Sequence, residues 1–310
     1  MRILLLGCTG FIGKELIPKL IDKGHELCIV SRRNINQIQL NVPLDQISFL
    51  KLNLSIQKNW QDINLINQLK RCEGIINLTG EPIADKRWDN SHKTEIEESR
   101  INTTKFLMKN LAILKINPKV IVNASAVGYY GTSLTNEFDE NSPSGKDFLA
   151  NLCNAWESEA NKKPFFTRLV IFRIGIVLGS DGGALGKMMP IFKLGLGGPI
   201  GSGNQWMSWI HRTDMCSLII EALTNKKYSG TYNAVAPDPV TMKIFSKCLA
   251  ECLNRPNILS VPAIPLRILI GDGAKLVLEG QKVISKKLFS KNFKFKYPLL
   301  KQALSSAAKK

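Results

Sequence analysis

The stretch that decides the fold of this chain is Arg2-Ile3-Leu4-Leu5-Leu6-Gly7-Cys8-Thr9-Gly10-Phe11-Ile12-Gly13. Residues 2–6 are almost entirely apolar, which is typical of a strand buried on both faces of a parallel sheet. Apolar side chains then recur at helical spacing over residues 11–23. Gly24 ends the predicted helix, and Pro18 predicts a kink or a local break within it. The pattern is therefore strand, glycine-rich turn and helix, the first part of a βαβ unit.

The three glycines of the turn have the spacing G-x-x-G-x-x-G. We expect Gly7 to permit the tight turn, Gly10 to let the backbone approach a pyrophosphate, and Gly13 to let the helix pack closely on the strand. Free N–H groups at the start of the helix would hold the pyrophosphate. The turn predicts a dinucleotide site formed by Gly7, Thr9, Gly10, Phe11, Ile12 and Gly13.

The end of the second strand indicates which dinucleotide binds. Enzymes that use NAD place a carboxylate there, which accepts a hydrogen bond from the ribose 2′-hydroxyl. This chain has Ser31-Arg32-Arg33 instead, with no carboxylate nearby. A guanidinium pairs well with a 2′-phosphate and can stack on adenine. The sequence therefore predicts NADP(H) as the cofactor; the alternative for one of the two arginines is a solvated loop residue.

The ends of the other strands would complete the cofactor site. Asn53 and Leu54 follow the third strand and could flank the adenine. Thr79, Gly80 and Glu81 follow the fourth strand and could cover the ribose and the pyrophosphate. After the fifth strand, Ala124 and its neighbours would lie near the nicotinamide.

Strands and helices alternate along most of the chain. Further strands are predicted at 26–31, 47–52, 74–78, 119–124, 167–173, 206–210 and 230–234, and helices at 59–71, 90–114, 146–160 and 213–224. This alternation predicts an α/β fold, a Rossmann doubly wound parallel sheet with its ligand crevice at the carboxyl ends of the strands. We expect a Rossmann domain over 1–240, with a glycine-rich substrate-side insertion around 179–205. A smaller, mostly helical C-terminal subdomain would occupy 241–310.

Composition narrows the class of protein. The chain has 310 residues and a formal charge of +17. Its seven cysteines are scattered along the sequence, a pattern that favours free thiols and a reducing compartment. No apolar run reaches the roughly 18 residues of a membrane span, and the first strand begins at Arg2, so we expect a cytoplasmic protein. The charge raises the possibility of nucleic-acid binding, but a lysine-rich solvated surface is the favoured explanation.

Several further segments carry a resemblance to a known family. They are Asn77 to Trp88, Ala124 to Gly131, Phe148-Leu149 with Trp156-Glu157, Gly201 to Gly203, Gln205-Trp206, Ser208 to His211, Asp214, and the tail from Leu276 to Leu304. Together with the glycine turn they resemble the extended short-chain dehydrogenase/reductases, in a branch described as atypical nucleoside-diphosphate-sugar epimerases with their own C-terminal domain. The resemblance implies a Rossmann fold, NADP binding and a small polar substrate, for example a nucleotide sugar.

One feature of that superfamily is missing. Its enzymes use a Tyr-x-x-x-Lys pair on the helix after strand five, in which the lysine lowers the pKa of the tyrosine that exchanges a proton with the substrate. Aligning Glu157 with the glutamate that often follows the pair puts Leu149 and Cys153 at the two positions. The candidates for a replacement acid or base are Ser125, Tyr129, Tyr130 and His211, besides Glu81, Asp85 and Lys86.

These candidates also have structural interpretations. Tyr129 and Tyr130 could simply wall the pocket, and His211 could order the turn before a helix capped by Thr213 or Asp214. On the substrate side we expect Arg87, Trp88, Arg173 and Trp206. Arg87 and Trp88 could instead pin a loop, and Arg173 could form a structural ion pair. No metal site is expected.

Two functions remain open at this point. One is an NADP-dependent oxidoreductase or epimerase with a non-standard acid or base. The other is a protein that holds NADPH without turnover, as a sensor or scaffold. The missing pair favours the second, whereas the charged and aromatic loop from Glu81 to Trp88 favours the first. The oligomeric state is left open.

Overall fold

The computed structural model describes residues 1–38, 42–43 and 46–308. Its centre is a seven-stranded sheet in the order β11-β7-β5-β4-β1-β2-β3, with every neighbouring pair parallel. The strands are β1 (Arg2–Leu6), β2 (Glu26–Ser31), β3 (Ile47–Lys51), β4 (Gly74–Asn77), β5 (Val120–Ala126), β7 (Arg168–Ile174) and β11 (Gly230–Ala234). The predicted doubly wound parallel sheet is therefore confirmed.

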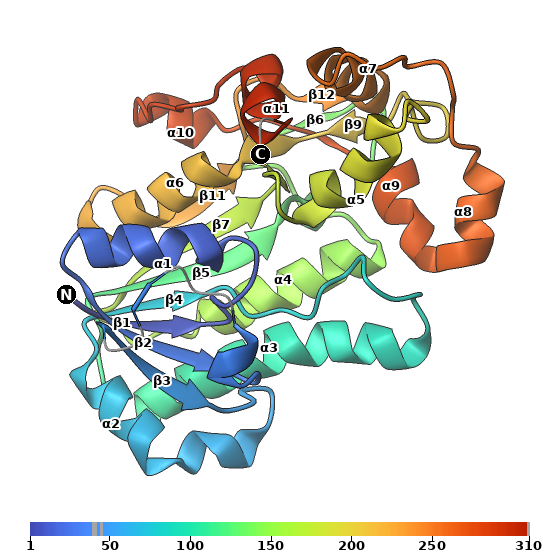
Figure 1. Cartoon of the computed structure of the whole chain (residues 1–310). Coiled ribbons are helices and arrows are strands. Elements are labelled where there is room, and N and C mark those ends of the chain that lie inside the picture. The colour runs from blue at the N-terminus through green and yellow to red at the C-terminus, as the bar shows by residue number, and fades with distance from the viewer. Residues whose placement is uncertain (39–41, 44–45, 309–310) are drawn as a thin grey trace.

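Helices cover both faces of the sheet (Figure 1). One face carries α1 (Gly13–Asp22) and α6 (Arg212–Thr224), and the other carries α2 (Ile63–Arg71), α3 (Asn90–Ile113) and α4 (Phe148–Ala160). Alternation along β1 divides the core: Ile3 and Leu5 pack with the first set, while Leu4 and Leu6 pack with the second. This double burial explains why the strand is apolar from Ile3 to Leu6. Pro18 lies inside α1 without ending it.

A third cluster lies beyond the sheet. It joins β8 (Ile176–Leu178), α5 (Gly183–Lys193), β9 (Trp206–Met207), β10 (Trp209–His211), β12 (Val240–Thr241), α7 (Met242–Cys252) and α11 (Leu300–Ala308). The single strand predicted at 206–210 is wrong: β9 pairs with β12, and β10 pairs with β8. Ser208 separates them because its hydroxyl bonds to the backbone at Gln281 and Val283.

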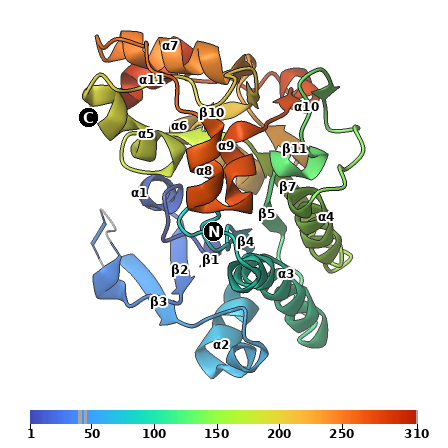
Figure 2. The ribbon, with the colours of Figure 1, turned by 90° about the vertical axis from the view of Figure 1, so that its right-hand side faces the viewer.

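The C-terminal part is mostly helical, as predicted, and it lies against the rest of the chain. In Figure 2, α8 (Ala263–Ile270) and α9 (Lys275–Leu278) lie in front of the carboxyl ends of the strands. Further along, β13 (Lys282–Val283) pairs with β6 (Glu137–Phe138), and α10 (Lys286–Ser290) packs on β11. Asp214 on α6 accepts the backbone N–H groups of Lys296 and Tyr297. Of the residues after 241, Val261 and those around α9 therefore lie over the edge of the sheet where a ligand is expected.

Candidate functional site

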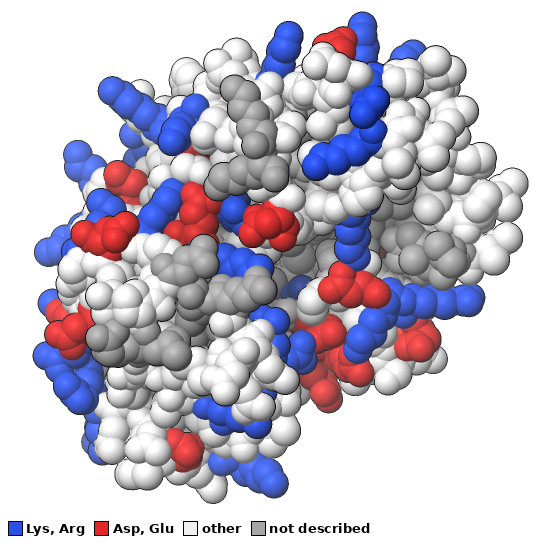
Figure 3. All heavy atoms as spheres, in the orientation of Figure 1, with Lys and Arg blue, Asp and Glu red and all other residues white. Residues whose placement is uncertain are grey.

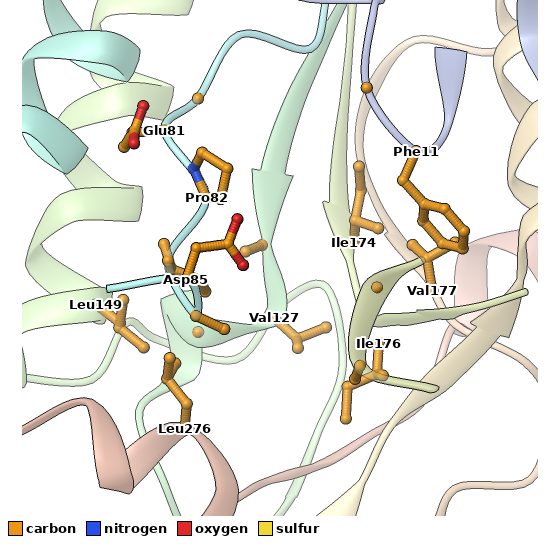
Figure 4. A pocket seen from close by; sticks show the side chains of 18 of the residues that line it. Phe11, Glu81, Pro82, Asp85, Val127, Leu149, Ile174, Ile176, Val177 and Leu276 are labelled. Carbon is orange, nitrogen blue, oxygen red and sulfur yellow. The ribbon is translucent and has the colours of Figure 1, made fainter. Parts of the chain in front are cut away.

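A cavity of about 1450 Å³ opens at the carboxyl ends of the strands. This volume exceeds the ~300–1,000 Å³ of ordinary small-molecule pockets, so it has room for an extended ligand. Figure 4 shows Phe11 on one wall and Leu149 with Leu276 on the other, with Val127 and Ile174 between them. The cavity therefore lies where a doubly wound sheet binds its ligand.

The glycine turn forms one end of this cavity. Gly7 has φ +69°, and a Cβ there would lie 2.5 Å from the Cα of Thr79, so both conformation and space require glycine. A Cβ on Gly13 would lie 1.5 Å from the carbonyl oxygen of Cys8, which fixes how closely α1 packs on the turn. Gly10, by contrast, has nothing within 4 Å of an added Cβ, and it lines the cavity with Gly7, Thr9 and Phe11. The open space beside Gly10 would let a pyrophosphate approach the backbone of the turn.

The arginines after β2 lie beside this turn. The Arg33 guanidinium donates to the Thr9 carbonyl oxygen at 2.7 Å and to its hydroxyl at 3.1 Å, while the Thr9 and Ser31 hydroxyls lie 3.2 Å apart. Arg32 pairs with the carboxylate of Glu81, and its side chain is 57% exposed. Ser31, Arg32 and Arg33 all line the cavity. Arg33 therefore braces the turn, whereas Arg32 is largely exposed and is held by the Glu81 carboxylate.

The other predicted strand ends surround the same space. Asn53, Leu54, Thr79, Gly80 and Glu81 line the cavity. Asn77 at the end of β4 accepts hydrogen bonds from the Thr79 backbone and hydroxyl, which fixes the turn beside Gly7. On β5, Ala126 lines the cavity and Ala124 is buried within the strand.

The loop after β4 closes the side of the cavity. Trp88 is buried, and its indole N–H donates to the Ile83 carbonyl oxygen at 2.6 Å. Trp88 also forms an isolated β-bridge with Gly271. Arg87 packs against the same glycine, because a Cβ on Gly271 would lie 3.3 Å from the Arg87 Nε. Of the two interpretations of this pair, the structure shows contacts that pin the loop. Asp85 pairs with Lys187 of α5, and both line the cavity.

Glu81, His92 and Glu95 bring ligand-type atoms within 4.8 Å of one another. The Lys86 ammonium lies between the two carboxylates, 3.5 Å from Glu81 and 2.8 Å from Glu95. Because Arg32 also pairs with Glu81, two cations balance the two carboxylates, and the cluster is an ion-pair network.

Ser125, Tyr130 and Arg173, which the sequence predicted as site residues, form a buried hydrogen-bond network with Glu157. Arg173 makes a two-pronged ion pair with Glu157, both bonds being 2.8 Å. The Ser125 hydroxyl donates to Glu157 at 2.7 Å, and Arg173 donates to the Tyr130 hydroxyl at 2.9 Å. Of the two alternatives for Arg173, the structure shows the ion pair. Burial raises the pKa of Tyr130 to about 12, which holds this phenol neutral.

Tyr129 belongs to the same region, and the Arg173 guanidinium lies 3.4 Å from the centre of its ring. This stacking holds the Tyr129 ring on the buried arginine.

His211 is the N-cap of α6, a role that the sequence assigned to Thr213 or Asp214. Its Nδ1 accepts the Thr213 N–H at 3.1 Å, and its ring lies 4.0 Å from that of Tyr297. Burial lowers the pKa of His211 to about 4, so the ring is neutral at physiological pH. Trp206 lines the cavity and donates from its indole to the Leu134 carbonyl.

Leu149 and Cys153, which stand at the positions of the missing pair, both line the cavity. So does Arg100 on α3, which no sequence motif singled out. Its place depends on how α3 packs against α4, a contact that the local pattern of the sequence does not reveal.

On the face that Figure 3 shows, basic side chains are scattered and interspersed with acidic ones. This distribution matches a solvated surface better than a continuous nucleic-acid groove. Within the described ranges, no helix combines the length and apolarity needed to cross a membrane.

The sheet order and the glycine turn define a Rossmann-type dinucleotide-binding fold. The chain belongs to the NAD dependent epimerase/dehydratase family, which it matches over residues 3–234, while residues 261–307 match a domain of unknown function, DUF1731. The family resemblance inferred from the sequence is therefore confirmed.

Relatives of this chain are named as members of an epimerase family. It is 42% identical to the chloroplastic epimerase family protein SDR39U1 homolog of Arabidopsis thaliana, over 98% of this chain and 86% of that protein. It is 36% identical to epimerase family protein YfhF of Bacillus subtilis, over 98% and 97%. The crystal structure of human SDR39U1 (isoform 2) with NADPH superposes with a TM-score of 0.86 at 34% identity, covering 100% of this chain and 99% of that one.

Proposed function

We propose that this protein binds NADP(H) and acts as an oxidoreductase or epimerase on a small polar substrate, with a nucleotide sugar as the leading candidate. The observation that carries the cofactor assignment is the open face of Gly10 beside Arg32 and Arg33 in one cavity. The similar human protein was crystallised with NADPH, which supports the same choice. Bound NADPH would supply a hydride to an acceptor carbon.

Different residues of the cavity would hold the cofactor and enclose the substrate. Gly7, Thr9 and Gly10 would hold the pyrophosphate at the start of α1, and Arg32 would exchange Glu81 for the 2′-phosphate. The apolar side chains of Val127, Leu149 and Ile174 would exclude water from the nicotinamide end. The loop from Glu81 to Trp88, with α9, would enclose the substrate.

Which residue replaces the tyrosine of the Tyr-x-x-x-Lys pair as acid or base stays a prediction. Ser125, Tyr130 and His211 have polar atoms engaged in structural hydrogen bonds, so their variants should disturb stability as well as any activity. Asp85 and Lys86 line the cavity and belong to the loop that the sequence pointed to. They are the first positions to replace in a search for the proton donor.

Hydride transfer tests the proposal. The purified protein would be incubated with NADPH deuterated at C4 and a panel of carbonyl compounds, and separately with NADP⁺ and a panel of nucleotide sugars, because an epimerase must first oxidise its substrate. Products would be separated by chromatography and analysed by mass spectrometry. We expect deuterium in a product of the first incubation or a new epimer in the second, and loss of that product in Asp85→Asn or Lys86→Met if either residue is the donor.

A second function is favoured by Leu149 and Cys153, which leave the usual proton-transfer positions without a titrating pair at neutral pH. It is a sensor or scaffold that holds NADPH without turnover. Tight NADPH binding with neither deuterium transfer nor epimer formation across the panels would support it against the enzyme.

A further inference from the structure

In this superfamily a lysine on the helix that corresponds to α4 supplies a positive charge to the site, whereas here the charge comes from Arg100 on α3. On α4, the lysine position is occupied by Cys153, which is buried, and burial raises the pKa of its thiol to about 11. The thiol is therefore neutral, and Leu149 one turn earlier is apolar. This part of α4 supplies no charge to the cavity.

Arg100 of α3 lines the same part of the cavity. A Cβ on Gly80 would lie 2.8 Å from the Arg100 Cζ, so the guanidinium packs directly on the turn after β4. Arg100 and Cys153 both line the cavity, and the Arg100 Cζ lies 5.6 Å from the centre of the ring of Trp156, which follows Cys153 by three residues on α4. The guanidinium therefore lies against the part of α4 that carries the vacated lysine position.

The guanidinium is held in a fixed orientation. It donates to the Glu81 carbonyl at 3.0 Å and to the Ile96 carbonyl at 3.1 Å, and its Cζ lies 5.6 Å from the centre of the Trp156 ring. These contacts use only part of its five N–H donors. An oriented arginine with remaining donors is suited to bind ligand oxygens.

In the part of the chain that the structure describes, no carboxylate lies within 4.0 Å of the Arg100 guanidinium, although the charge of Glu81 is near enough to raise the pKa of Arg100. Arg32, Arg173 and Arg212 each lie within 4.0 Å of a carboxylate, whereas no such pair is formed by Arg100. Burial lowers the pKa of Arg100 to about 10, which still leaves it charged at neutral pH. A partly desolvated cation with no carboxylate in direct contact favours an electron-rich ligand group.

We propose that Arg100 takes the place of the missing lysine and hydrogen-bonds the ribose and phosphate oxygens in the nicotinamide half of NADP(H). Glu81, Ile96 and Trp156 act as its positioning groups. The proposal rests on the NADP(H) binding proposed above. Its location favours this half of the ligand, because Arg100 lies between the β4 turn and α4, whereas Arg32 and Arg33 follow β2 on the adenosine side.

Two probes separate the halves of the ligand. NADPH carries both halves, and adenosine 2′,5′-bisphosphate carries the adenosine and the 2′-phosphate without the nicotinamide half. Each would be titrated calorimetrically into the wild type, Arg100→Met, Arg100→Lys and the double variant Arg100→Met with Cys153→Lys. Lys105→Met, an exposed change on the same helix, is the matched control. Thermal unfolding would show that each variant is folded.

We expect Arg100→Met to weaken NADPH binding by about tenfold to a hundredfold, the usual effect of losing charge-assisted hydrogen bonds, and to leave the bisphosphate unaffected. Arg100→Lys should retain part of the affinity, and Cys153→Lys should restore part of it by returning a cation from α4. Unchanged NADPH binding in folded Arg100→Met would overturn the proposal. Equal weakening of both probes would also overturn it. If the wild type binds neither probe, the proposed function itself fails.

Discussion

Replacement of Glu157 by glutamine tests whether the network behind the cavity is structural. Glu157 and Arg173 are 6% and 5% exposed and share two hydrogen bonds of 2.8 Å. The substitution preserves shape but leaves the Arg173 charge buried without a counter-ion. Breaking one partner of such a pair typically costs about 3–5 kcal/mol, so we expect the free energy of unfolding to fall by about that amount in urea titrations.

The matched control is Glu159→Gln on the same helix. Glu159 pairs with Lys162, whose side chain is 61% exposed, and exposed pairs are worth about 1 kcal/mol or less. Replacing Glu157 and Arg173 together by methionine should recover most of the lost stability, because no charge is then left unpaired. A Glu157→Gln variant that loses no more stability than Glu159→Gln would refute the structural account of this network.

Three further predictions use other parts of the site. Gly10→Ala should fold normally but lose NADPH affinity in calorimetry, whereas Gly13→Ala should destabilise the fold because its Cβ meets backbone at 1.5 Å; similar melting temperatures for the two variants would contradict this. The pKa of His211 is about 4 in the folded protein and 6.5 in the unfolded chain. Protonation of the unfolded chain should therefore lower the free energy of unfolding as pH falls from 6.5 toward 4, with no such loss above pH 6.5. His211→Asn, which can still cap the helix, should flatten that part of the pH profile of unfolding free energy, and an unchanged profile would count against it. Lys187→Ala removes the exposed pair with Asp85, so stopped-flow release of NADPH should be faster by about fivefold or less, and an unchanged rate would show that the pair does not hold the loop.

The sheet could be predicted because its signals are local. The run from Ile3 to Leu6 is apolar on both faces, and the glycine turn follows it directly, so β1 and the start of α1 could be predicted from adjacent residues. The same holds for β2, whose predicted and observed bounds coincide at Glu26–Ser31. The cofactor residues at the strand ends could be proposed for the same reason, since parallel strands bring their carboxyl ends together.

The remaining features depend on contacts between distant segments. Ser208 interrupts a predicted strand because its hydroxyl binds the chain near Gln281. Arg100 reaches the cavity only because α3 packs beside α4, and His211 becomes a cap because β10 delivers it to the start of α6. No spacing rule in the sequence reports such packing.

The most direct test of NADP(H) binding is a calorimetric comparison of NADPH and NADH for the wild type and for Arg32→Asp with Arg33→Ala. The wild type should prefer NADPH by about tenfold or more, as expected for charge-assisted contacts to the 2′-phosphate. The variant should lose much more affinity for NADPH than for NADH, although the loss of the Arg33 contacts with Thr9 weakens both. Equal loss for the two nucleotides, or a wild type that does not distinguish them, would contradict the assignment.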